Sequence, residues 1–154
     1  MKAIICLGFF FLLTQKIISQ QTACWDSVSS VIKKFRKGNK VFRDNEGKIK
    51  RFYFLNKKTN QITGVTIGNN AEHTGAHYYY SNTELILMRI EVPYSAMPSS
   101  IGKPMGSAYF FKDDTLTNKC ELNFPIINIE KYKLEGLELY KKAILFLKRK
   151  GINL

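Results

Sequence analysis

The chain has 154 residues and carries 24 basic against 12 acidic side chains, a formal net charge of +12. This length favours a single domain with one modest hydrophobic core. Beyond the N-terminus no apolar run approaches the length of a membrane-spanning helix, so the composition excludes a protein with several such helices and predicts a soluble mature chain.

Residues 1–19 resemble a secretory signal peptide. Lys2 supplies a positive start, residues 3–13 are apolar but too short to span a bilayer, and Ser19 precedes the expected cleavage site. An uncleaved anchor is one alternative. A lipoprotein is another, because Cys24 ends a lipobox-like triplet, although Gln21 stands where that motif has leucine. The main prediction is a single secreted or periplasmic domain over residues 20–154.

Two of the three cysteines remain after cleavage. Cys6 leaves with the leader, whereas Cys24 and Cys120 stay in the mature chain. A pair of cysteines in an oxidising compartment predicts a structural disulfide. The alternative is a nucleophilic thiol, which would need a base beside it, and both histidines are distant in sequence.

The remaining elements follow in chain order. Asp26-Ser27 can cap a first helix that runs to about Lys37, where Gly38 stops it. Short apolar runs separated by polar turns then predict antiparallel strands. These strands are expected over residues 40–43, 48–55, 61–67, 77–80, 85–92, 107–112 and 115–122.

The strand over residues 85–92, LILMRIEV, is expected at the centre of the sheet. Alternation divides its side chains between the two faces. One face is predicted to pack against the C-terminal helix and carries Ile86, Met88, Ile90 and Val92. The other face carries Leu85, Leu87, Arg89 and Glu91.

Residues 130–150 are predicted to form the C-terminal helix. Its apolar stripe consists of Leu134, Leu137, Tyr140, Ile144 and Leu147. Gly136 lies inside this pattern and weakens the helix by ~1 kcal/mol, and Gly151 is its stop signal. The expected fold class is therefore α+β, with an N-terminal helix, a six- to seven-stranded antiparallel meander sheet, and a C-terminal helix packed on one sheet face.

Two segments repeat the same plan of an aromatic strand, a polar turn and a strand with threonine. They read RFYFLNKKTNQITGV and AYFFKDDTLTNKC. Over residues 40–122 the chain resembles small secreted bacterial proteins built from YYF-x-(D/N)G-K-L hairpins, which are distantly similar to MORN-type repeats. In this chain Asp114-Thr115 replaces the usual turn glycine. The resemblance implies no catalytic residues.

The motifs of common enzymes are absent from the sequence. It contains no Gly-x-Ser-x-Gly, P-loop or dinucleotide fingerprint. His73 and His77 have the spacing of a helical zinc pair, but Gly75 and the following tyrosines favour a strand, where the two would be roughly 13 Å apart. Asp113-Asp114 is expected to be a solvated turn. We therefore assign no catalytic residue, metal or cofactor from the sequence.

The most unusual feature is a basic segment. Residues 33–58 contain eleven basic and two acidic side chains, a charge of +9. The proposed basic patch consists of Lys33, Lys34, Arg36, Lys37, Lys48, Lys50 and Arg51. Such a patch can hold an anionic polymer, or it can be a solvated face that aids solubility. No nucleic-acid-binding module is recognisable.

The sequence thus predicts a secreted or periplasmic, non-enzymatic binding module. It would contact a protein or an anionic polymer through a sheet face or the basic patch. The alternative is a small hydrolase that uses His73 or His77 with an unassigned carboxylate. The two hypotheses differ in one structural requirement, because the hydrolase needs a histidine beside a carboxylate in a concave pocket.

Overall fold

The computed structural model describes residues 22–35, 37–69, 74–91, 106–121 and 128–154. The chain divides into one unit that ends at Lys34 and a second that runs from Phe35 to Leu154. The predicted leader, Arg36, His73, Val92 and the long loop over residues 95–105 lie outside the described residues.

A helix over residues 22–35 accounts for the described part of the first unit. It begins earlier than the sequence predicts. Ser27 is not a cap but lies inside the helix, where its Oγ donates a hydrogen bond to the Ala23 carbonyl oxygen at 3.0 Å. This i to i−4 bond is the way in which serine is accommodated within a helix. The predicted glycine stop is present, since Gly38 has a φ of +79°.

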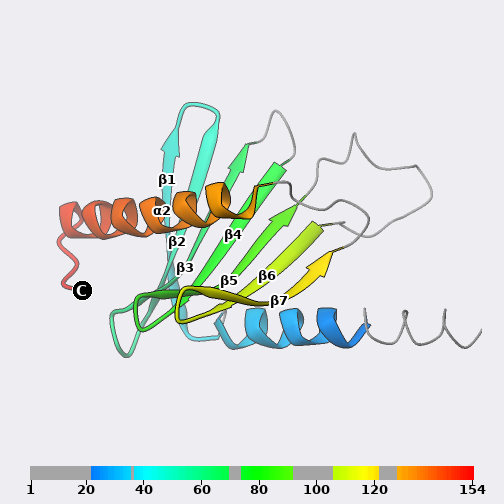
Figure 1. Ribbon diagram of the computed structural model, residues 1–154. Helices are drawn as coiled ribbons and strands as arrows, with labels where there is room; N and C mark the ends of the chain where they lie inside the picture. The colour runs from blue at the N-terminus through cyan, green and yellow to red at the C-terminus, as the bar shows by residue number, and fades with distance from the viewer. Residues whose placement is uncertain (1–21, 36, 70–73, 92–105, 122–127) are drawn as a thin grey trace, which may run out of the picture. The chain divides into compact units, whose positions relative to one another are not determined.

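The second unit is a seven-stranded sheet with one long helix (Figure 1). The strands are β1 Asn39–Glu46, β2 Ile49–Asn56, β3 Ile62–Asn69, β4 Thr74–Ser81, β5 Glu84–Glu91, β6 Gly106–Lys112 and β7 Thr115–Glu121, and the helix is α2 Ile129–Arg149. The strands pair in sequence order, each antiparallel to the next. The predicted α+β meander with a C-terminal helix on one sheet face is confirmed.

Two tight turns have the backbone that short hairpins prefer. Asn82 and Thr83 have φ of 49° and 74°, and Asp113 and Asp114 have φ of 49° and 63°. Two successive positive φ values characterise turns whose twist matches that of the flanking strands. Asparagine and aspartate tolerate this region, whereas the β-branched Thr83 is strained there. The expected turns after β4 and β6 are thus present without glycine.

The register of β5 differs from simple alternation at one point. Met88 and Ile90 belong to the core beneath α2, as predicted, but so does Leu85. A bulge between Tyr79 and Tyr80 makes Leu85 pair with Tyr80 and Leu87 with Tyr79. The bulge shifts by one residue the alternation of side chains between the two faces. Leu85 therefore belongs to the core in place of Ile86, and the prediction was wrong for these two residues.

The packing of α2 depends on its small residues. Its buried side includes Gly136, Leu139, Ala143 and Leu147. Leu134, which the sequence places on the apolar stripe, is 60% exposed, so that part of the prediction was wrong. A Cβ at Gly136 would lie 2.5 Å from the Tyr78 ring. Because Gly136 has no side chain, the Tyr78 ring of the sheet can pack directly against α2 at this position.

Buried tyrosines of the sheet hydrogen-bond through their hydroxyls. Tyr80 donates to the Gly136 carbonyl at 2.6 Å, and Tyr78 donates to the Glu135 carboxylate at 2.8 Å. Tyr53 donates to the Asp44 carboxylate at 3.1 Å. Burial, with Asp44 adding to it, raises the pKa of Tyr53 to about 12. Burial also raises the pKa of Tyr78 and Tyr80 above the usual range.

These shifts predict loss of stability in alkali. The folded state favours the neutral phenol, so its contribution is complete below pH ~10 and declines as pH rises toward the folded pKa, by about 1.4 kcal/mol per pH unit for each tyrosine. We expect the midpoint of urea unfolding to fall steadily between about pH 10 and pH 12, and less steeply in Tyr80→Phe. An unchanged midpoint over this interval would contradict the assignment.

Candidate functional site

The sheet has two faces with different contents. The helix face, defined as the side that packs against α2, carries Tyr53, Val65, Tyr78 and Met88. Alternation and register place Phe52, Thr66, His77 and Arg89 together on the opposite face. The candidate site lies on this opposite face.

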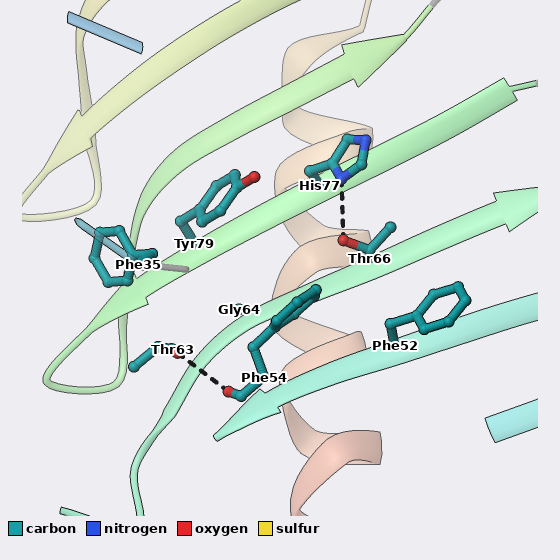
Figure 2. A pocket seen from close by; sticks show the side chains of 8 residues that line it. All are labelled: Phe35, Phe52, Phe54, Thr63, Gly64, Thr66, His77 and Tyr79. Carbon is teal, nitrogen blue, oxygen red and sulfur yellow. Dashed lines mark hydrogen bonds between the residues drawn. The ribbon is translucent and has the colours of Figure 1, made fainter. Parts of the chain in front are cut away.

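The opposite face contains a hollow of about 150 Å³. Four aromatic rings, two threonines, a glycine and a histidine form its lining (Figure 2). We call it the aromatic hollow, and its lining residues are Phe35, Phe52, Phe54, Thr63, Gly64, Thr66, His77 and Tyr79. The rings of Phe35 and Tyr79 lie 5.8 Å apart between centroids.

The local sequence explains why a hollow forms here. Phe52 and Phe54 alternate with Tyr53 and Leu55, so both phenylalanine rings project from one face of β2. Gly64 pairs with Phe54 across the strands. A Cβ at Gly64 would lie 3.2 Å from the Tyr78 carbonyl oxygen and 3.5 Å from the Phe54 ring. The absent side chain therefore leaves space between the rings.

Both threonines of the aromatic hollow are held by hydrogen bonds. A bulge at Phe54/Leu55 accompanies Thr63, whose hydroxyl donates to the Phe54 carbonyl at 3.2 Å. The Thr63 hydroxyl oxygen in turn accepts a hydrogen bond from the Asn39 side-chain amide at 2.9 Å. The Thr66 hydroxyl lies 3.0 Å from Nδ1 of His77, as Figure 2 shows. The polar atoms of the hollow are thus fixed in orientation.

A line of polar groups continues from Thr66 across β4 and β5. Nε2 of His77 lies 3.2 Å from a Glu91 carboxylate oxygen, and the Arg89 guanidinium lies 3.0 Å from the same oxygen. Within the described chain, His77 Nε2 and Arg89 Nε are buried without a hydrogen bond of good geometry. The His77 imidazole and the Glu91 carboxylate therefore lie close together without a well-aligned hydrogen bond. Histidine, hydroxyl and carboxylate nevertheless stand in one row.

Cations lie beside the aromatic hollow on β1 and β2. The Arg43 guanidinium lies 5.2 Å from the centroid of the Phe52 ring, within the range of a cation–π contact. Lys50 is two residues from Phe52 on the same face. Val41, which pairs with Phe54, is 53% exposed. The surface next to the hollow is therefore both apolar and positively charged.

The structure describes six of the seven residues of the predicted basic patch. Lys33 and Lys34 are exposed on the helix of the first unit, and Lys37 and Lys48 are exposed in the second. Lys50 is half-buried on the opposite face, as alternation predicts. Arg36 lies outside the described residues. Whether these residues bind a ligand stays a prediction.

Arg51 projects from the helix face and uses its charge locally. It is 7% exposed, and its guanidinium lies 2.7 Å from the Glu46 carboxylate and 3.7 Å from that of Asp44. The hydrogen bond from Arg51 lowers the pKa of Glu46. A second hollow of about 400 Å³ adjoins this cluster, with Lys142 and Arg149 of α2 in its lining. The charges there are of both signs.

The two histidines and the cysteines Cys24 and Cys120 were the other residues considered as possible sites. His73 lies outside the described residues, and His77 is on β4, as the tyrosines after it indicate. No cluster of three or more metal-binding side chains occurs within the described residues. Cys24 and Cys120 are disulfide-bonded, and this is the predicted pair.

Four residues of this face, Arg43, Phe54, Thr66 and Glu91, were not predicted from the sequence as members of a site. Alternation of the aromatic residues in β2 was the one signal that pointed to the hollow.

Among the described helices, none combines the length and apolar character needed to cross a membrane. Comparisons with protein-family models, with curated proteins and with solved structures found no match.

Proposed function

We propose that the protein is a secreted or periplasmic, non-enzymatic binding module that binds an anionic polymer through the face of the sheet opposite α2. The observation that carries this proposal is the aromatic hollow with the Arg43 guanidinium beside its Phe52 ring. Half-buried aromatic rings next to cations provide both apolar contact area and attraction for negative charge.

The overall charge favours the same class of ligand. The chain has a formal net charge of +12, and a positive surface raises the local concentration of an anionic partner and its rate of association. Arg51 is paired with Glu46, whereas Arg43 and Lys50 flank the hollow. These two cations, rather than the whole predicted patch, are the ones that we assign to the ligand.

The proposed location rests on two features. Disulfides persist in oxidising compartments, and Cys24 and Cys120 are bonded. The N-terminal residues have the composition of a signal peptide. The resemblance to secreted aromatic-hairpin proteins agrees with this location and stays a prediction.

The test is retention on a heparin support at increasing salt. The change is Arg43→Gln with Lys50→Gln, and the matched control is Lys131→Gln with Lys141→Gln, two exposed lysines of α2. Each lost contact removes about one released counterion, so the first variant should elute at lower salt and its salt slope should decrease by about 2. The control should lose less of both.

Two further outcomes are informative. If Lys37→Gln with Lys48→Gln lowers retention as much as the variant at Arg43 and Lys50, the predicted patch is part of the site. If all of these variants elute with the parent, neither set of cations binds the polymer and the proposal is wrong.

A hydrolase is the second candidate, because the histidine of the aromatic hollow does stand beside a carboxylate. The Thr66 hydroxyl is 3.0 Å from one ring nitrogen of His77, and Glu91 is 3.2 Å from the other. This order resembles a nucleophile, base and orienting acid. Glu91 is also paired with Arg89, which weakens its hold on the imidazole. Ester turnover that disappears in Thr66→Val would favour the hydrolase over the binding module.

A further inference from the structure

We infer that the aromatic hollow is the subsite for one six-membered sugar ring of an acidic polysaccharide, with the acidic group of that polymer at Arg43 and Lys50. This inference rests on the proposed function and narrows its ligand class. If it holds, the hollow contributes to the binding of anionic polymers built from rings and not to the binding of anionic polymers without rings.

The size of the hollow sets the first limit. Its volume is about 150 Å³, and an apolar cavity of about 150 Å³ holds one benzene molecule. One ring therefore fits, and neighbouring units of a polymer must lie outside the hollow. The adjacent surface has room for them, because Val41 beside Phe54 is 53% exposed.

The lining sets the second limit. The face of an aromatic ring carries partial negative charge and attracts the C–H groups of a saturated ring laid against it. Phe52, Phe54 and Tyr79 supply such rings, and Thr63 and Thr66 add hydroxyls. A sugar ring combines C–H faces with hydroxyl edges and so matches this lining better than a hydrocarbon chain does.

The charges set the orientation. Arg43 lies over Phe52 on the β1–β2 side of the hollow. Glu91 lies beyond His77 on the other side, where Arg89 and His77 already face its carboxylate. An anionic substituent is therefore attracted to the β1–β2 side and gains nothing on the β5 side.

Single-stranded nucleic acid also combines rings with negative charge, and its bases stack on aromatic side chains. The disulfide favours the polysaccharide, because it indicates an oxidising compartment. Nucleic acid is therefore one of the outcomes that the experiment must distinguish.

The experiment compares the affinities of three probes at equal salt: polygalacturonate, long-chain polyphosphate and single-stranded DNA. The variant is Phe54→Leu, which keeps an apolar side chain and removes the ring. The matched control is Phe110→Leu, the same change at a half-buried position on the same face but outside the hollow. Circular dichroism verifies that both variants are folded.

Loss of a ring contact costs about tenfold in affinity. We expect Phe54→Leu to weaken polygalacturonate binding by about that factor and to leave polyphosphate binding unchanged, and Phe110→Leu to change neither. Equal polygalacturonate affinity in Phe54→Leu and the parent would overturn the ring subsite while leaving the binding module intact. If the parent binds DNA but not polygalacturonate, and Phe54→Leu weakens the binding of DNA, the ligand is single-stranded nucleic acid and not a polysaccharide. If the parent binds none of the probes, the proposed function itself fails.

Discussion

Replacing Gly136 with alanine should destabilise the protein by about 1–2 kcal/mol, even though alanine is the better helix former. The new methyl group would lie 2.5 Å from the Tyr78 ring. That ring is held by the bond from its hydroxyl to Glu135. Overpacking of a core typically costs about 1–3 kcal/mol, and alanine regains about 1 kcal/mol of helix propensity. With a contact this short, the cost of overpacking exceeds the gain.

Urea unfolding measures this effect, and the test is whether Gly136→Ala lowers or raises the free energy of unfolding. The control is Lys141→Ala, at an exposed position of α2, which should change the free energy of unfolding by less than about 0.5 kcal/mol. Tyr78→Leu combined with Gly136→Ala should recover part of the loss, because the two side chains share one space. A stabilised Gly136→Ala variant would show that α2 does not approach the sheet so closely.

Removing the disulfide should have the largest effect of all. The bond joins Cys24 to Cys120 and closes a loop of about a hundred residues, for which the chain-entropy model gives up to ~4–5 kcal/mol. We expect Cys24→Ser with Cys120→Ser to lower the free energy of unfolding by about 2–5 kcal/mol. The reduced parent should unfold at the same urea concentration as the double variant.

Thiol titration provides the direct measurement for this bond. A variant that lacks residues 1–19, and with them Cys6, should show no reactive thiol until it is reduced, and two afterwards. Two reactive thiols in this variant before reduction would contradict the bond. The single variants Cys24→Ser and Cys120→Ser should each expose one thiol and lose as much stability as the double variant does.

Much of the sheet was predictable because its signals are local. Polar turns separate runs of strand-forming residues, and consecutive antiparallel strands need short connections. Lys50 and Arg51 could be assigned to different faces because side chains alternate along a strand. The same rule placed Phe52 and Phe54 together, and the cysteine count indicated the disulfide.

The tertiary structure decided the contacts that depend on pairing between strands. The bulge at Tyr79/Tyr80 altered the phase of β5, and a bulge has no clear signature in a single strand. Thr66, His77 and Glu91 meet because three strands align in one register, which alternation within each strand does not specify. From the sequence, Gly136 was predicted only to weaken the C-terminal helix. The reason for a glycine there is the close approach of the Tyr78 ring, which comes from a strand far away in the sequence. Local patterns therefore determined the order and faces of the elements, whereas the site and the closest packing required the position of side chains across the sheet.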